Sequence, residues 1–208
     1  MSHHKELLKL LIQAYEHQQQ KDNREALVLY HKAVERFGAN PHLFVAIALC
    51  HYRLTVDSRE SEPDHGREAI SWMSQAVTME PNRGAWHYLL GEMYQIIMND
   101  YEHAAQEFRR AIELNPHNAQ ELFNAASLYE YPEKVVTLEE VIGWLEHATE
   151  VAPQDPHCRF RLGEFYHRAG RSSEAEEEWI VALSWCSQTP YYQGFIGTIR
   201  EAIETDEE

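Results

Sequence analysis

Apolar residues recur along this chain at intervals of three and four, which is the spacing of residues on one face of an α-helix. Five segments end in tyrosine and carry leucine or alanine four residues before it: residues 8–15, 45–52, 87–94, 122–129 and 159–166. After each comes a second stretch in which a small residue, a large apolar residue and an alanine share one face, at spacings of four and then three. These triplets are Ala26, Tyr30 and Ala33; Ala69, Met73 and Ala76; Ala104, Phe108 and Ala111; Val141, Leu145 and Ala148; Ala175, Trp179 and Ala182. The pattern predicts an all-α protein of successive helix pairs.

The connections between the predicted pairs are regular, whereas those within a pair are not. The distance from the last alanine of one pair to the leucine or alanine of the next is nearly constant, but the distance across the turn inside a pair varies by several residues. Stacking of repeated units explains this, because an extra residue at a junction would misplace every later pair, while one in an exposed turn is tolerated. Pro81, Pro116 and Pro153 each follow a last alanine by five residues and predict the end of a helix.

Two of the internal turns carry distinct signals. The longest, from Thr55 to Gly66, is rich in charged residues and predicts a solvated loop. The turn from Pro132 to Thr137 is shorter and ends at a residue suited to cap a helix, with Glu140 three positions on.

This order of residues resembles the tetratricopeptide repeat, a helix-turn-helix unit of about 34 residues. The third copy, with Leu90-Gly91 and Pro116, matches the pattern most fully, and the first departs most, with Ile12 in place of glycine and Gly38 in place of proline. The resemblance covers residues 5–189 and implies a right-handed α-solenoid with repeats at about 5–39, 41–82, 84–117, 119–154 and 156–189. Residues 190–204 are expected to form a C-terminal capping helix over the open apolar end, followed by an acidic tail at 205–208.

The charge of the chain limits the classes of partner that it is expected to bind. Its 34 acidic and 18 basic residues give a formal net charge of −16, which disfavours nucleic acid and anionic lipid surfaces. Three cysteines, Cys50, Cys158 and Cys186, form no Cys-x-x-Cys pair and suit reduced, buried thiols in a reducing compartment. The charged first residues do not fit a signal peptide, and no apolar stretch is long enough to span a bilayer. We therefore expect a cytoplasmic protein.

The resemblance implies that the first helices of successive repeats line a concave groove that receives a peptide or helix of a partner. Aromatic residues could anchor apolar side chains, an asparagine could bind peptide backbone, and arginines could bind a carboxylate. An alternative remains open, in which Tyr88, Phe123 and Phe160 only fill the space between neighbouring helices. The predicted groove residues are Lys9, Gln13, Tyr88, Glu92, Phe123, Asn124, Ser127, Phe160, Arg161, Glu164 and Arg168.

One subclass of the family grips the acidic C-termini of chaperones with lysines, asparagines and an arginine. Asn124 and Arg161 stand at such positions here, but Tyr88, Glu92 and His157 replace the remaining members. The acidic groove residues would also repel an acidic tail. The sequence therefore favours an apolar or amphipathic segment of some basic character as the ligand.

Motifs of catalysis and metal binding are weak in this sequence. It contains no Gly-rich phosphate loop, no His-Glu-x-x-His and no nucleophile elbow, so we expect neither an enzyme nor a cofactor. The start Ser2-His3-His4 could chelate Cu(II) or Ni(II) through a free amine, but a frayed terminus or an expression remnant is the simpler interpretation.

Three non-enzymatic functions remain. The leading hypothesis is a protein-interaction scaffold or adaptor with a peptide-binding groove. A second is a self-assembling scaffold that forms homo-oligomers, suggested by the face of Leu7, Leu8 and Leu11 at the N-terminus. A third is a chaperone that shields apolar segments of a client.

Overall fold

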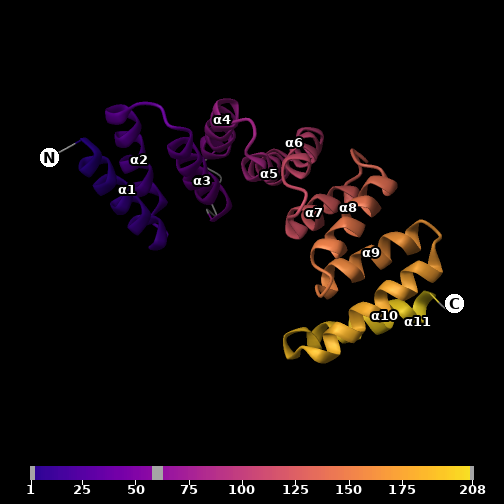
Figure 1. Ribbon diagram of the computed structural model, residues 1–208. Helices are drawn as coiled ribbons and strands as arrows, with labels where there is room; N and C mark the ends of the chain where they lie inside the picture. Colours follow the sequence, from indigo (N-terminus) through magenta and orange to yellow (C-terminus); the bar gives the residue numbers. More distant parts are fainter. Residues whose placement is uncertain (1–2, 58–62, 207–208) are drawn as a thin grey trace. The chain divides into compact units, whose positions relative to one another are not determined.

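The computed structural model describes residues 3–57 and 63–206, and within these residues all regular structure is helical. The chain divides into two compact units, Met1–Leu114 and Asn115–Glu208. In each unit the helices follow one another as antiparallel pairs (Figure 1). The all-α fold class that the sequence predicts is therefore confirmed.

Unit 1 contains three helix pairs. Its helices are α1 (His3–Gln19), α2 (Asn23–Phe37), α3 (Pro41–Asp57), α4 (Pro63–Met79), α5 (Gly84–Met93) and α6 (Tyr101–Leu114), with a π-helical turn at Tyr94–Met98 that follows α5. One core cluster joins α1, α2 and α3, and a second joins α3, α4 and α5. Within unit 1 the first pair thus packs on the second and the second on the third, as expected of stacked repeats.

Unit 2 contains two helix pairs and a terminal segment. Its helices are α7 (Ala119–Ala126), α8 (Leu138–Val151), α9 (Pro156–Arg168), α10 (Ser172–Gln188) and α11 (Ile196–Asp206), with 3-10 turns at Ser127–Glu130 and Pro190–Phe195. The terminal segment packs on α10, where Ile199 is fully buried. It differs from the predicted single helix, because a 3-10 turn precedes α11 and the helix continues to Asp206.

The Leu-Gly pairs of the sequence mark the closest helix contacts. A Cβ atom added at Gly91 would lie 2.8 Å from the ring of Phe108, and one added at Gly163 would lie 2.5 Å from Cδ1 of Trp179. Each aromatic ring belongs to the second helix of the same pair and packs directly on the glycine backbone. The small residues therefore allow the two helices to approach around a large ring.

The predicted helix boundaries at Thr137 and the prolines are confirmed. Thr137 caps α8, accepting a hydrogen bond from the backbone N–H of Glu140, whose carboxylate accepts one from the N–H of Thr137. Pro81, Pro116 and Pro153 lie just after the ends of α4, α6 and α8. These are local signals, so the sequence alone locates them.

The first helix of the first pair exposes apolar residues that the sequence pattern aligns with more buried positions of the later pairs. Ile12 and Tyr15, which the sequence pattern aligns with the glycine and tyrosine positions of the later pairs, are 49% and 58% exposed. Leu10 and Ala14 are buried instead, and Ala14 belongs to the same core cluster as Ala26 and Ala33. Ala14 directly precedes its tyrosine, and the residues at the same position in the later pairs, His51, Met93, Leu128 and Phe165, are buried as well, so the register of α1 matches that of the other first helices.

The long turn of the second pair is also shorter than predicted. Thr55 lies in α3, and Gly66 is a buried residue of α4. A Cβ atom at Gly66 would lie 2.5 Å from Cγ2 of Ile97 in the π-helical turn, which explains a glycine inside a helix. The remaining part of the predicted loop, residues 58–62, lies outside the described residues.

Candidate functional site

A depression of about 400 Å³ in unit 2 gathers most of the predicted groove residues of that unit. It is formed by α7 and the turn after it, by α9 and by the terminal segment. Its lining residues are Phe123, Asn124, Ser127, His157, Phe160, Arg161, Glu164 and Phe195. Six of these were predicted from the helical register, so the periodicity of the sequence identifies one face of two neighbouring first helices.

Three aromatic side chains form the apolar part of this depression. The ring of Phe160 meets that of Phe195 edge to face, with centroids 5.0 Å apart. The His157 ring lies 4.6 Å from Phe195, while Phe123 contributes from α7. Phe160 and Phe195 are only partly buried, so their rings offer apolar surface to a ligand as well as to each other.

The two predicted arginines are held by carboxylates of the chain itself. Arg161 pairs with Glu164 at 3.0 Å and with Glu130 at 2.7 Å, and Arg168 pairs with the same Glu130 oxygen at 2.7 Å. Both guanidinium groups also lie about 5 Å from the centroid of the Phe165 ring. A carboxylate ligand would have to compete with Glu130 and Glu164 for these arginines.

The protonation of Glu130 reflects this arrangement. Partial burial acts to raise the pKa of its carboxyl, but hydrogen bonds and charges from Arg168 and Arg161 hold the pKa below its ordinary value. Glu130 therefore stays ionised at neutral pH and balances positive charge at the edge of the depression.

Asn124 is oriented by its own helix. Its Oδ1 accepts a hydrogen bond from Nε2 of Gln120 at 2.8 Å, one turn earlier on α7. This fixes the plane of the carboxamide at the wall of the depression. A contact of Asn124 with peptide backbone stays a prediction.

The other predicted groove residues lie in unit 1. Lys9 and Gln13 are exposed on α1. The Tyr88 ring packs on Phe108 at 5.5 Å, which for this residue favours the packing interpretation. Burial raises the pKa of the Glu92 carboxyl, partly offset by a hydrogen bond from Tyr88. A shared groove of these residues with those of unit 2 stays a prediction.

One wall of the depression is not evident from the sequence. Phe195 lies outside the repeats, within residues 190–204, which the sequence predicts to form a capping helix with Phe195 and Ile199 on its apolar face. The sequence indicates His157 as a replacement in a chaperone-type clamp. The apolar spacing of Phe195 with Ile199 was the available signal, but nothing in it says that the ring would lie beside Phe160.

The possible metal ligands and the cysteines are described within residues 3–57 and 63–206. No group of three or more His, Cys, Asp or Glu side chains there is arranged to hold a metal ion. The Ser2-His3-His4 motif begins outside these residues. Cys50, Cys158 and Cys186 are buried and unpaired, as the sequence predicts. None of the described helices combines the length and apolar character that crossing a bilayer requires.

Comparisons with known proteins agree with this architecture. Residues 87–118 match the tetratricopeptide repeat family. The structure of MamA aligns with 86% of this chain and 97% of its own, at a TM-score of 0.70 and 18% identity. YrrB, described as a TPR protein with an unusual peptide-binding site, aligns with 85% of this chain and 84% of its own, at a TM-score of 0.64 and 18% identity. TTC0263, a thermophilic TPR protein of Thermus thermophilus, aligns with 93% of this chain and 98% of its own, at a TM-score of 0.55 and 16% identity. No curated protein matches the chain.

Proposed function

We propose that this chain, which contains the tetratricopeptide repeat and has the all-α fold of proteins built from it, is a non-enzymatic scaffold that binds other proteins. Its ligand would be an extended or helical segment of a partner, held in the depression between α7 and α9. One observation carries the proposal: six residues that the helical register predicts as groove residues lie together with Phe195 around the same depression. The peptide-binding site named in the description of YrrB is consistent with this use of the fold.

The chemistry of the depression indicates which ligand it would take. Phe123, Phe160 and Phe195 supply an apolar surface, and aromatic side chains dominate binding energy in desolvated pockets. Arg161 is neutralised by Glu130 and Glu164, so the site has no unbalanced positive charge for an acidic tail. An amphipathic segment with one large apolar side chain fits best.

The cellular setting is part of the same proposal. Buried, unpaired cysteines suit a reducing compartment, and we place the protein in the cytoplasm. The strongly negative charge makes a protein partner more favourable than nucleic acid or an anionic membrane surface.

A two-stage binding experiment tests the groove. Partners captured by the tagged chain are identified by mass spectrometry, and the segment that binds is then titrated by calorimetry. Phe123→Ala and Phe195→Ala should each weaken binding by about tenfold or more, because each removes an aromatic anchor. Ile180→Ala is the matched control, since Ile180 is 53% exposed on α10 and does not line the depression. Unchanged affinity in both aromatic variants, with thermal melts like those of the parent, would show that the groove is assigned wrongly.

A second function, self-assembly, is favoured by one surface of α1. Leu8, Ile12 and Tyr15 are 52%, 49% and 58% exposed and lie on one helical face at spacings of four and three. Leu7 and Leu11, which the sequence predicts to be part of this surface, pack instead against the core. An exposed apolar stripe of this kind is typical of association surfaces.

Light scattering over a range of concentrations tests self-assembly. If the stripe joins two copies, the apparent mass should rise with concentration and fall to that of a monomer in the double variant Ile12→Lys with Tyr15→Lys. A parent protein that is monomeric throughout the range would exclude this function.

A further inference from the structure

Unit 2 contains a second depression, which we call the terminal depression because the end of α10 forms part of its wall. Its volume is about 500 Å³. The turn that leads into α9 and the 3-10 turn after α10 complete it. Its lining residues are Gln154, Asp155, Trp185, Gln188, Thr189 and Tyr192. None of them lines the groove between α7 and α9.

Aromatic side chains make up much of the lining of the terminal depression. Trp185 and Tyr192 are only partly buried, so their rings offer surface to a ligand. Tyr191, the preceding residue, is 85% exposed and meets the Tyr192 ring edge to face at 5.0 Å. The faces of such rings carry partial negative charge and attract cations. The aromatic lining therefore favours a positively charged ligand over an anion.

Asp155 is the single charged side chain that lines the terminal depression among the described residues. As the N-cap of α9, its Oδ1 accepts a hydrogen bond from the backbone N–H of His157 at 2.9 Å. Its Oδ2 is contacted at 3.8 Å by the thiol of Cys158, which is a weak donor. Within residues 3–57 and 63–206, no Lys or Arg side chain forms an ion pair with this carboxylate.

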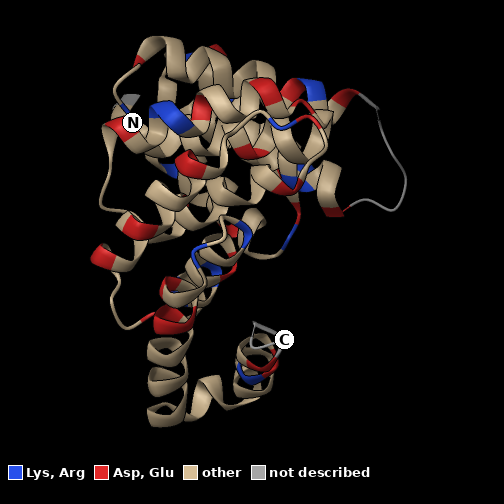
Figure 2. Ribbon diagram, turned by 90° about the vertical axis from the view of Figure 1, so that its right-hand side faces the viewer, with Lys and Arg blue, Asp and Glu red and all other residues tan. Residues whose placement is uncertain are grey.

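The cations of the neighbouring chain are engaged elsewhere or absent. Arg159 is the cation closest to Asp155 in the sequence, but its Nε donates to the carbonyl oxygen of Pro153 at 2.9 Å. Its Nη1 pairs with Glu178 at 2.7 Å. Residues 179–199, which supply the other wall residues, contain no Lys, Arg, Asp or Glu. Figure 2 shows this uncharged stretch in tan, just before the short C-terminal helix.

The carboxylate and the aromatic rings act on the same space. Burial and, next to it, the negative charge of Asp155 raise the pKa of the Tyr192 hydroxyl. The carboxylate therefore lies close enough to this ring to act on it electrostatically. A cation between the two is attracted both by the charge of Asp155 and by the face of the ring.

We propose that the terminal depression binds an arginine side chain of a partner protein. The guanidinium group stacks on the rings of Trp185 and Tyr192 and donates a hydrogen bond to Oδ2 of Asp155. Arginine suits this lining better than lysine, because its planar group both stacks on aromatic rings and donates directional hydrogen bonds. Charge complementarity selects a basic residue, and the net charge of −16 steers basic segments toward the chain. The inference uses no residue of the groove between α7 and α9.

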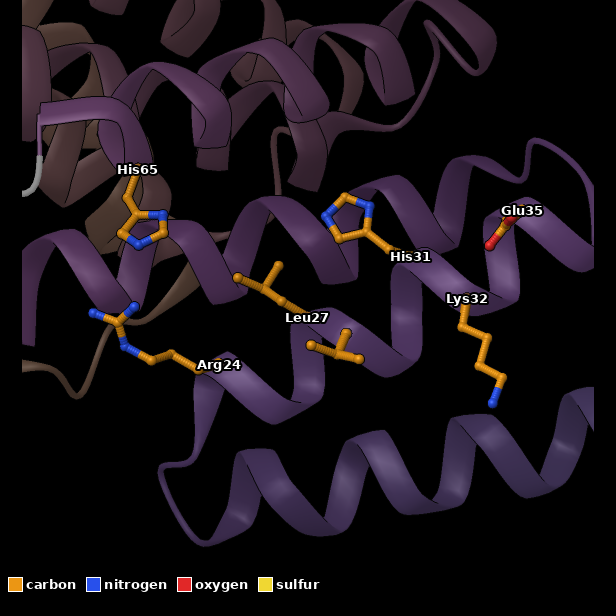
Figure 3. A pocket seen from close by; sticks show the side chains of 7 residues that line it. Arg24, Leu27, His31, Lys32, Glu35 and His65 are labelled. Carbon is orange, nitrogen blue, oxygen red and sulfur yellow. The ribbon is translucent and has the colours of Figure 1, made fainter.

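A depression in unit 1 has a different lining and provides a control. Figure 3 shows Arg24 and Lys32 among its side chains, together with the carboxylate of Glu35. Its volume is about 630 Å³, and Glu35 is exposed. Glu35→Gln therefore removes one negative charge from a depression in which an arginine ligand would meet two cations.

A nuclear magnetic resonance titration of the full chain tests the site. The probe is the capped peptide acetyl-Gly-Ser-Arg-Ser-Gly-amide. In the comparison peptide citrulline, which has the same shape without the charge, replaces arginine. The arginine peptide should shift the indole N–H signal of Trp185 saturably and bind at least about threefold more tightly than the citrulline peptide. The variant Trp185→Phe assigns that signal.

Two variants remove the two parts of the site separately. Asp155→Asn keeps a residue that caps helices well but removes the charge, and Tyr192→Leu keeps an apolar side chain but removes the ring. Each should weaken binding of the arginine peptide by about three- to fivefold, with thermal melts like those of the parent. Glu35→Gln and Tyr15→Leu are the matched controls, because Tyr15 is 58% exposed on α1, and should leave the affinity within about 1.5-fold.

Four results would overturn the proposal. The first is the lack of a saturable shift at Trp185, and the second is equal binding of the citrulline peptide. The third is a loss in Glu35→Gln equal to that in Asp155→Asn, which would reduce the attraction to unspecific charge. The fourth is an equal loss in Phe123→Ala, which would place the peptide in the groove between α7 and α9. The function proposed for that groove is tested with captured partners and does not depend on these outcomes.

Discussion

Because Gly163 packs against Trp179, we predict that substituting glycine by alanine has opposite effects on stability at positions 143 and 163. An alanine at an exposed position inside a helix is about 1 kcal/mol more stable than a glycine. Gly143, in the middle of α8, has nothing within 4 Å of an added Cβ, so Gly143→Ala should stabilise the protein by about that amount. Gly163→Ala makes the same chemical change in α9, where the ring of Trp179 occupies the space.

The loss of stability expected for Gly163→Ala depends on how far the Trp179 ring can move. Trp179 is 97% buried, and its Nε1 donates a hydrogen bond to the carbonyl oxygen of Phe160 at 3.1 Å. A Cβ atom 2.5 Å from Cδ1 forces the ring or the helix to move, and overpacking of this kind costs about 1–3 kcal/mol. A lost hydrogen bond adds about 1 kcal/mol, and the helix preference offsets a similar amount. The net expectation is a destabilisation of about 1–3 kcal/mol.

Urea unfolding of the two variants and the parent measures this difference. The midpoint should rise for Gly143→Ala and fall for Gly163→Ala, with slopes that stay close to that of the parent. Because Trp179 holds the backbone of Phe160, Gly163→Ala should also weaken ligand binding in the groove of unit 2. A Gly163→Ala variant as stable as Gly143→Ala would refute the close helix contact.

Three further predictions concern register and protonation. In α1, Tyr15→Ser should change the free energy of unfolding by less than about 0.5 kcal/mol, whereas Ala14→Leu should cost about 1–3 kcal/mol. The opposite order in urea melts would contradict the burial of Ala14 and the exposure of Tyr15. Because the pKa of Glu130 is lowered in the folded protein, its ionised carboxyl stabilises the fold above the unfolded pKa of about 4.3, and this stability is lost as the pH falls through the folded pKa. Glu130→Gln should therefore be less stable than the parent by about 0.5–1 kcal/mol at pH 7 and equally stable near pH 2. A difference in the free energy of unfolding that stays constant with pH would contradict this. His51, with a pKa of about 4 when folded against about 6.5 when unfolded, takes up a proton on unfolding between these two pH values. Its own contribution to stability should therefore fall by about 3 kcal/mol from pH 7 to pH 4, and His51→Gln should lose less stability than the parent over that range, as urea melts at the two pH values would measure.

Much of the fold could be predicted because its signals are local and repeated. The glycines at 91 and 163, the prolines after the helices and the cap at Thr137 each act within a few residues of their own position. The first pair was harder, since its many leucines and isoleucine offer two overlapping apolar faces. Which face is buried depends on Ala26 and Ala33 of α2, so a tertiary contact decides it.

The candidate groove was predictable in part for the same reason. Helical register identifies Phe123, Asn124, Phe160 and their neighbours as one surface. It does not reveal that Arg161 pairs with Glu130, because that ion pair joins residues 31 positions apart. The charge available to a ligand could therefore be counted from the sequence, but its neutralisation could not.

The position of Phe195 has a consequence for how such repeats can be exchanged. The wall that it contributes follows the last repeat and is encoded outside the repeated unit. Grafting residues 119–189 alone onto another array would transfer the backbone of the hollow but omit one of its aromatic sides. Appending a further repeat after α10 would displace the same side chain. The segment at Pro190–Phe195 thus has to follow directly on α10 if the depression is to keep its shape, so the number of repeats and the shape of the depression cannot be varied separately.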